Sequence, residues 1–323
     1  MKRIIFEGQS YGCKENETVL ECLTSHGVPV PSSCKAGICQ TCLMSATKGN
    51  LPPESQKGLK STLIEQNYFL ACSCRPVEDI EVSMPEPGKG KIPATVIGIE
   101  PLNRDIVCVK LDPAGPFEYR AGQYINCFKD ASTARSYSLA SVSRLDDCIK
   151  LHVRKIPQGI VSTWIHEALA PGDRIEISEA AGDCFYVPGN PEQGLLLIGT
   201  GSGLAPLYGI VRDALLEGHS GPIRLYHGSL NVEGLYLIEE LRRLSEEHEN
   251  FTYAPCVSQG DAPEGFYQGI VLDVALKETG KLSGWRVYLC GNPDMVNAAR
   301  KKTFLAGASM KDIYADPFLP APS

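Results

Sequence analysis

The stretch that decides the fold of the first part of this chain is Cys34-Lys-Ala-Gly-Ile-Cys39-Gln-Thr-Cys42, followed at a distance by Cys72. Three thiols at a C-x4-C-x2-C spacing, with a remote fourth, form the arrangement that binds a [2Fe–2S] cluster. Four thiolates must converge on a compact group of atoms. Ala36 and Gly37 are small enough to let the backbone curl around the cluster and turn N–H groups toward its sulfides. The spacing therefore predicts a [2Fe–2S] centre whose ligands are Cys34, Cys39, Cys42 and Cys72.

Two alternatives remain at this point. A zinc site or a set of buried structural cysteines is possible, but zinc loops favour paired C-x2-C elements and this stretch has only one such pair. The segment Tyr68-Phe-Leu-Ala-Cys72-Ser-Cys74 is expected to be a strand, so Cys72 and Cys74 would share a face and alternation cannot choose between them. The segment resembles the Leu-Ala-Cys end of plant-type ferredoxin domains, where the cysteine after Leu-Ala is the ligand. This resemblance favours Cys72.

Composition limits the class of protein. A chain of 323 residues suggests two or three domains. We expect no membrane span, because no run of 18 apolar residues occurs, and the first residues look like a strand and not a secretory signal. The thirteen cysteines of so large a chain fit a reducing compartment, so we expect a cytoplasmic protein. A net charge of −7 without a basic stripe argues against nucleic-acid binding.

The pattern of elements changes twice along the chain. Residues 1–84 predict one small domain with an early hairpin and a helix that ends at Gly27, and the Pro- and Gly-rich residues 85–92 predict a linker. Residues 93–188 contain short, closely spaced strands and one helix near 160–170, which is typical of an antiparallel β-barrel. Residues 189–323 alternate strand and helix, with helices expected over 205–216, 235–244 and 295–304. This alternation predicts a doubly wound α/β domain.

A second motif, Arg135-Ser-Tyr-Ser138, lies on an expected barrel strand. Alternation places Arg135 and Tyr137 on one face and Ser138 on the other. By itself such a tetrapeptide arises often by chance. It gains weight from Ala121-Gly-Gln-Tyr124 before it and from Gly159-Ile-Val-Ser162 after it, where a helix N-terminus could bind phosphate.

The ordered set of these motifs, with Gly199-Thr-Gly-Ser-Gly203 and Cys290-Gly-Asn-Pro293, resembles the ferredoxin–NADP reductase superfamily over residues 93–318. Together with the preceding cluster domain, the chain resembles the reductase component of bacterial multicomponent oxygenases. The resemblance implies a multidomain protein: an α+β, β-grasp ferredoxin domain, an antiparallel β-barrel FAD domain and a doubly wound α/β NAD domain. It also implies three cofactors, which are a [2Fe–2S] cluster, FAD and NADH.

The resemblance also implies roles for single residues. Ser138 would hydrogen-bond the flavin, Cys290 would lie beside the hydride path, and Phe318 would shield the flavin, with Tyr314 as a competing core residue. These three are the expected catalytic residues. A histidine on a strand, such as His152, is more often a core or rim residue than a proton carrier. The expected cofactor-binding residues are Arg135, Tyr137, Ser138, His152, Val153, Arg154, Gly159, Ser162, Thr200, Gly201, Gly203, Pro206 and Cys290.

The glycine motif at 199–203 departs from G-x-G-x-x-G, so on spacing alone it could be any tight strand–helix turn. The choice of coenzyme can be argued from charge. NADPH carries an extra phosphate that requires Arg or Lys near the adenine ribose. The segment 225–235, where the family makes that contact, has neither and contains Glu233. We therefore expect NADH.

The combination of cofactors predicts an enzyme. NADH gives two electrons as a hydride, a [2Fe–2S] cluster takes one electron at a time, and a flavin can do both. We therefore expect an NADH-dependent oxidoreductase that passes electrons from NADH through FAD and the cluster to an oxygenase component or its ferredoxin. A reductase for another metabolic enzyme, such as a deoxysugar dehydratase, is the alternative, and a redox-sensing module is a further one. Sequence does not identify the acceptor, the oligomeric state or any role of Cys74.

Overall fold

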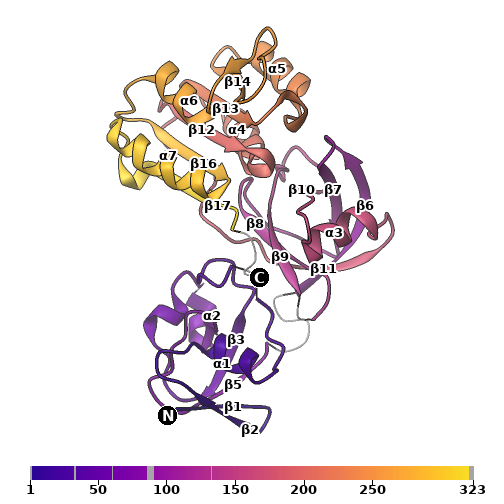
Figure 1. Ribbon diagram of the computed structural model, residues 1–323, viewed down its shortest axis with the longest axis vertical. Coiled ribbons are helices and arrows are strands. Elements are labelled where there is room, and N and C mark those ends of the chain that lie inside the picture. The colour runs from indigo at the N-terminus through magenta and orange to yellow at the C-terminus, as the bar shows by residue number, and fades with distance from the viewer. Residues whose placement is uncertain (1, 33, 60, 86–90, 132, 320–323) are drawn as a thin grey trace.

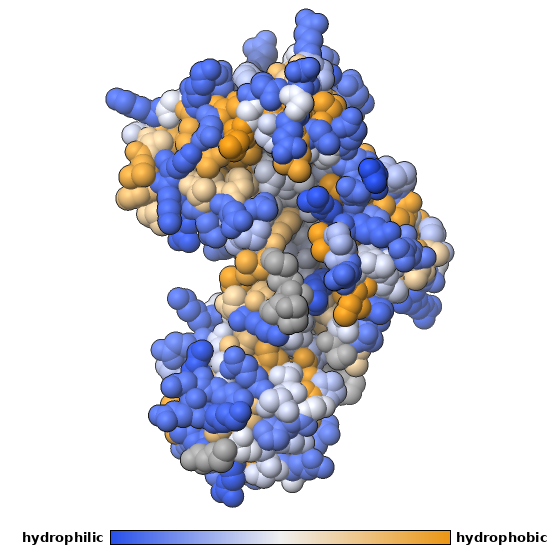
Figure 2. All heavy atoms as spheres, viewed as in Figure 1, coloured by the Kyte–Doolittle hydropathy of each residue, from blue (hydrophilic) through white to orange (hydrophobic). Residues whose placement is uncertain are grey.

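The computed structural model describes residues 2–32, 34–59, 61–85, 91–131 and 133–319. Its strands form one five-stranded and two six-stranded sheets, and each sheet belongs to one part of the chain. Figure 1 shows the N-terminal part at the bottom, the middle part at the right and the C-terminal part at the top. Figure 2 shows that polar side chains cover much of this face and that the outline narrows above the N-terminal part. No described helix has the length and apolar character that crossing a membrane requires.

The N-terminal domain packs a short helix against a mixed sheet of order β2-β1-β5-β3-β4, in which β1 and β5 are parallel. The helix α1 begins with a capping box, because Thr18 Oγ1 accepts from the Glu21 N–H and the Glu21 carboxylate accepts from the Thr18 N–H. Its elements are β1 (Lys2–Phe6), β2 (Gln9–Cys13), α1 (Val19–Ser25), β3 (Leu43–Lys48), η1 (Pro53–Gln56), α2 (Ser61–Glu65), β4 (Tyr68–Leu70) and β5 (Ile80–Ser83).

The middle domain is the expected antiparallel sheet of six strands, in the order β10-β7-β6-β11-β8-β9. The sheet curls so that its two ends meet at an isolated bridge between Leu139 and Leu151, without a continuous ladder. Its elements are β6 (Lys91–Pro101), β7 (Ile106–Pro113), β8 (Tyr124–Phe128), β9 (Ala134–Ser138), β10 (Ile149–Arg154), α3 (Ile160–Glu167) and β11 (Arg174–Ser178).

The C-terminal domain is a parallel sheet of order β15-β14-β13-β12-β16-β17. Alternate residues of β12 pack on opposite faces: Leu195 and Leu197 against α4 and α5, Leu196 and Ile198 against α6 and α7. This is the doubly wound arrangement. Its elements are β12 (Leu195–Thr200), η2 (Gly201–Gly203), α4 (Leu204–Leu216), β13 (Ile223–Ser229), η3 (Val232–Gly234), α5 (Ile238–Glu247), β14 (Phe251–Val257), β15 (Tyr267–Gln268), α6 (Val271–Thr279), β16 (Arg286–Gly291), α7 (Pro293–Leu305), η4 (Met310–Asp312) and β17 (Ile313–Pro317).

Some local predictions were wrong. The strand expected over 68–74 ends at Leu70, because Ser73 and Cys74 both donate their N–H groups to the Leu70 carbonyl and close a turn. The helix expected over 235–244 begins at Ile238 instead. The sequence patterns did not predict α2, β3, β5, α6, β15 or β17. Residues 86–90 of the predicted linker lie outside the described residues, and β6 begins at Lys91, two residues before the expected boundary.

Candidate functional site

The cysteines of the loop after α1 receive hydrogen bonds from the loop's own backbone. Cys34 Sγ accepts from the N–H groups of Ala36 and Cys39, at 3.3 and 3.4 Å, and Cys39 Sγ accepts from the Cys34 N–H at 3.4 Å. Gly37 donates its N–H to Cys72 Sγ at 3.3 Å. Gly37 has φ +74°, and a Cβ there would lie 2.5 Å from Ser73 Oγ, so glycine is required at this position. The loop thus presents N–H groups to sulfur, as a cluster site needs.

The four sulfurs form two pairs. A hydrogen bond from the Cys39 thiol, followed by backbone N–H groups, lowers the pKa of Cys34 to about 5. In the second pair, a hydrogen bond from the Cys42 thiol lowers the pKa of Cys72 to about 6. The hydrogen bonds that lower the pKa of Cys34 and Cys72 raise the pKa of their donors, Cys39 and Cys42, so one thiol of each pair favours the thiolate, the form that binds iron. A dinuclear cluster needs two ligands at each iron, and this pairing fits that requirement.

A single metal ion does not fit these four residues. Among the residues that the structure describes, the three-ligand group whose donor atoms all lie within 4.8 Å is instead Cys13, Glu17 and Cys22. One tetrahedral zinc would need all four cluster cysteines at one point. Cys13 and Cys22 are themselves buried thiols that donate to backbone carbonyls, and burial raises the pKa of both.

The turn after β4 separates the two candidates for the fourth ligand. Cys72 Sγ lies at the cluster loop, where it accepts from Gly37. Cys74 is fully buried in the domain core. The N-terminus of α1 fixes this turn, because Val19 donates to the Cys74 carbonyl and Leu20 to the Ala71 carbonyl. The geometry thus agrees with the choice of Cys72.

The flavin motif lies on β9, which pairs with β8. The register sets Tyr124 opposite Ser138 and Cys127 opposite Arg135, so Arg135 and Tyr137 lie on the other face from Ser138, as alternation predicts. Tyr137 packs against the barrel core, and burial raises its pKa. Ser138 is buried and faces outward, toward the other domains.

The helix α3 begins within Gly159-Ile-Val-Ser162, the segment that was expected to bind phosphate. Gly159 is its N-cap and no side chain caps it, so the first-turn N–H groups can receive a phosphate. A Cβ at Gly159 would lie 2.5 Å from Ser162 Oγ, which bonds the Ile156 N–H at 3.1 Å. This uncapped turn fits a phosphate, whereas Arg135 Nη1 donates to the Ala134 carbonyl at 2.6 Å, and its contact with a phosphate remains a prediction.

Of the three residues at the end of β10, His152 and Arg154 face the C-terminal domain and Val153 faces the barrel core. The His152 ring is buried against the C-terminal domain, with Nδ1 3.2 Å from the Tyr236 hydroxyl, and burial lowers its pKa to about 3. Val153 lies in the barrel core. Arg154 Nη1 lies 3.4 Å from the place of a Cβ at Gly201, beside the glycine turn. His152 is thus a neutral rim residue, and a flavin contact through its backbone remains a prediction.

The glycine turn joins β12 to α4. Gly201 has φ +54°, and a Cβ at Gly203 would lie 2.4 Å from the Cys290 carbonyl oxygen. Thr200 Oγ1 accepts from the Asn292 N–H at 3.1 Å, which ties the turn to the loop after β16, and Pro206 is buried in the first turn of α4. The carboxyl ends of β12 and β16 therefore meet at the place where parallel sheets bind ligands.

Asp316, a carboxylate that no sequence pattern indicated, also lies at this end of the sheet. Asp316 on β17 pairs with Cys290 on β16, and its Oδ2 accepts from Ser138 Oγ at 3.0 Å. Burial raises the pKa of Asp316 to about 6 and also raises the pKa of Cys290. Cys290 Sγ lies 3.8 Å from Cys184 Sγ. The buried Ser138 and Cys290 and the half-buried Asp316 thus lie together where the barrel meets the C-terminal domain.

Comparison with known proteins agrees with this geometry. Three families match in order: the 2Fe-2S iron-sulfur cluster binding domain over residues 4–77, the oxidoreductase FAD-binding domain over 93–186 and the oxidoreductase NAD-binding domain over 197–301. The reductase subunit of an aromatic O-demethylase from an Amycolatopsis species is 35% identical, over 97% of each chain. The ferredoxin–NAD(P)(+) reductase component of the naphthalene 1,2-dioxygenase system of Pseudomonas putida is 33% identical, over 94% of this chain and 93% of that one.

This chain belongs to the reductase components of oxygenase systems. The crystal structure of the Amycolatopsis cytochrome P450 reductase GcoB matches this reductase with a TM-score of 0.72 and 32% identity, over 100% of both chains. The ferredoxin reductase of carbazole 1,9a-dioxygenase shares the fold, with a TM-score of 0.67 and 22% identity over 98% of each chain. The expected fold class and the three cofactor-binding domains are confirmed.

The two aromatic candidates near the C-terminus of the reductase differ in their surroundings. Tyr314 stacks on the buried Tyr288, with ring centroids 5.2 Å apart, as a core residue does. Phe318 follows β17, is half-buried and donates its N–H to the Gly291 carbonyl at 2.8 Å. Its position beside the loop that follows Cys290 is compatible with a shield over the flavin, which remains a prediction.

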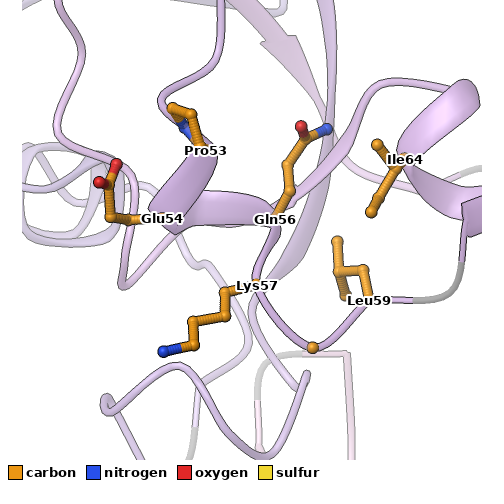
Figure 3. Close-up of a pocket in the computed structure, with 7 residues that line it drawn as sticks. Pro53, Glu54, Gln56, Lys57, Leu59 and Ile64 are labelled. Atoms are coloured by element: carbon orange, nitrogen blue, oxygen red, sulfur yellow. The ribbon is translucent and has the colours of Figure 1, made fainter.

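A shallow depression on the ferredoxin domain lies apart from these residues (Figure 3). Gln40 of the cluster loop donates to the Gly58 carbonyl at its floor, at 3.1 Å. None of the predicted ligands or cofactor contacts lines it, so we assign it no part in the chemistry. Its described lining residues are Pro53, Glu54, Gln56, Lys57, Gly58, Leu59 and Ile64.

Proposed function

We propose that this reductase takes a hydride from NADH and delivers single electrons through its [2Fe–2S] cluster to an oxygenase component or that system's ferredoxin. One observation carries the proposal. Strands β8 and β9 of the barrel contact both other domains: Asn126 bonds the cluster loop, and Ser138 bonds Asp316 of β17. The predicted sites for the donor, the flavin and the cluster therefore adjoin along two paired strands.

The overall reaction balances as NADH plus two oxidised acceptors giving NAD+, one proton and two reduced acceptors. Bound FAD supplies the change from two-electron to one-electron chemistry. The chain's own residues bind and orient. Arg135 and the open turn of α3 would hold phosphate, Ser138 would hydrogen-bond the flavin ring, and the turn at Gly201 would hold the nicotinamide nucleotide. Hydride transfer to a flavin needs no general acid or base.

The preference for NADH follows from the end of β13. The segment from Ser229 to Gly234 carries Glu233 and no cation that could pair with a 2′-phosphate. We expect a higher kcat/KM with NADH than with NADPH. Replacing Glu233 with Arg should lower the ratio of kcat/KM for NADH to kcat/KM for NADPH. Glu264→Arg, on another exposed loop, should leave this ratio unchanged. A wild-type preference for NADPH would contradict the proposal.

The acceptor is tested by reconstitution. The named relatives serve oxygenase systems, which favours an oxygenase over a dehydratase as the partner. NADH should reduce a one-electron dye at a steady rate, and the purified oxygenase component from the same gene neighbourhood should turn over only when the reductase is added. A single turnover followed by arrest would favour a redox sensor instead.

Two smaller proposals accompany this function. None of the thirteen cysteines, all of which the structure describes, forms a disulfide, so a reducing compartment, the cytoplasm, suits the protein. Phe318 would cover the flavin until the nicotinamide displaces it. Truncation after Pro317 should change the rate of hydride transfer while FAD stays bound. An unchanged rate would refute the shield.

A further inference from the structure

The contact between the ferredoxin domain and the barrel is made by buried polar groups. On the barrel side are Tyr124 and Asn126, alternate residues of β8 that share its outer face. They are 8% and 3% exposed, and Thr41 of the cluster loop is 6% exposed. Figure 1 shows β8 and β9 on the part of the barrel next to the ferredoxin domain. Buried polar side chains between two domains are costly unless each finds a partner.

Each of these side chains does find a partner on the cluster loop. Asn126 Nδ2 donates to the Cys39 carbonyl at 2.8 Å, and the Tyr124 hydroxyl donates to the Ile38 carbonyl at 2.5 Å. Thr41 Oγ1 lies 3.0 Å from Asn126 Oδ1. The loop is thus held at Ile38, Cys39 and Thr41, and Cys39 is itself a predicted iron ligand.

The barrel side of this contact is itself fixed. Asn126 Oδ1 also accepts from Ser136 Oγ of β9 at 2.7 Å, and its backbone N–H donates to Ser178 Oγ at 2.9 Å. Tyr124 pairs across the ladder with Ser138, the residue bonded to Asp316. The strands that hold the loop are therefore those that carry the flavin motif.

We propose that Asn126 and Tyr124 are positioning residues that hold the cluster loop at a fixed place against the flavin-binding strands and so set the rate at which the cluster is reduced. The inference rests on the proposed function. It goes beyond that function because neither residue is among the predicted cofactor contacts or cluster ligands. An isolated backbone bridge between Ser32 and Thr133 also joins the ferredoxin domain to the barrel.

Thr41 gives the proposal a second consequence. Its hydroxyl has one hydrogen but two acceptors within reach, Asn126 Oδ1 at 3.0 Å and Cys39 Sγ at 3.1 Å. Asn126 therefore competes with the cysteine sulfur for this hydrogen. A hydrogen bond to a ligand sulfur favours the reduced cluster, because it stabilises the added negative charge. Asn126 thus lowers the reduction potential of the cluster by drawing the Thr41 hydroxyl away.

The test uses the full-length holoprotein with Asn126→Leu and Tyr124→Phe. Tyr119→Phe is the matched control, since it removes one part-buried phenol hydrogen bond, to Ser141 at 2.8 Å, elsewhere in the barrel. A net hydrogen bond is worth up to about a factor of ten in an equilibrium, so we expect cluster reduction in stopped flow to slow roughly tenfold in both test variants. Flavin reduction by NADH should stay at the wild-type rate, and the control should match wild type throughout.

Two readouts do not depend on activity. Amide hydrogen exchange over residues 34–42 should be faster in both test variants and unchanged in Tyr119→Phe. The reduction potential of the cluster, measured by electron paramagnetic resonance, should rise in Asn126→Leu and fall in Thr41→Val, which a purely structural role would not produce. Wild-type exchange and wild-type cluster reduction in both test variants would overturn the proposal. Failure of NADH to reduce the cluster in the wild type would instead overturn the proposed function.

Discussion

Cys72 and Cys74 are two positions apart, but the turn that contains them directs one thiol to the cluster loop and the other into the core. Cys72→Ser should abolish the cluster, because one iron would lose a thiolate. Cys74→Ser should keep the cluster and cost less than about 2 kcal/mol of stability, since the neighbouring Ser55 hydroxyl can hydrogen-bond the introduced hydroxyl. Acid-labile sulfide and the visible spectrum measure both. Loss of sulfide only in Cys74→Ser would reverse the assignment.

Asp316 makes stability depend on pH. Burial raises its pKa to about 6, so the folded protein favours the protonated carboxyl. The stability this contributes is complete below about pH 4 and is lost as the pH rises through about 6. Between pH 5 and pH 7 the free energy of unfolding of the wild type should therefore fall by roughly 1 kcal/mol relative to that of Asp316→Asn. Denaturant unfolding of the holoprotein at the two pH values tests this, with the exposed Asp112→Asn as the control. Parallel changes in all three proteins would contradict it.

The element that binds the nicotinamide nucleotide depends on one close backbone contact. A Cβ at Gly203 would lie 2.4 Å from the Cys290 carbonyl oxygen and 2.6 Å from its carbon, and because both atoms are backbone, no side-chain rotation can relieve the contact. Gly203→Ala should push η2 away from β16 and raise the KM for NADH roughly tenfold or more. At Gly98 an added Cβ would meet only the Lys110 side chain at 3.4 Å, so Gly98→Ala is the control. FAD and sulfide contents should be normal in both, and an unaltered KM in Gly203→Ala would show that the turn can adapt.

What the sequence could predict depends on how local the determining contacts are. The spacing of Cys34, Cys39 and Cys42 expresses a loop geometry within nine residues, and short alternating runs predicted β6 to β11. Cys72 and Cys74 were placed on a strand because nothing local signals the turn that α1 stabilises. No local sequence pattern indicated a role for Asp316 or Asn126. Their roles arise from contacts between domains, at separations of 178 residues to Ser138 and 87 to Cys39.

At the scale of the whole molecule, the barrel and the NAD domain are joined by ion pairs of unequal burial. Asp146 of the barrel is bonded through both oxygens to Arg212 of α4 and also to Lys150, and its side chain is 4% exposed. Arg144 of the barrel pairs with Asp213 and Glu217 of the NAD domain, but its side chain is 53% exposed. Water screens the second contact far more than the first.

This difference in burial predicts which pair holds the two domains together. Burial alone would raise the pKa of Asp146, but hydrogen bonds from Arg212 and Lys150 outweigh this effect and lower the pKa. The ionised carboxylate therefore stabilises the folded protein near neutral pH, and this stability is lost as the pH falls below about 4. Asp146→Ala leaves Arg212 buried without its partner and should cost roughly 3 kcal/mol, whereas Arg144→Ala should cost less than about 1 kcal/mol. Denaturant unfolding at pH 7 measures both. Hydrogen exchange in α4 should rise only in Asp146→Ala, because α4 is the element that Arg212 attaches to the barrel. Equal costs for the two variants would mean that apolar packing, and not this buried carboxylate, joins the domains.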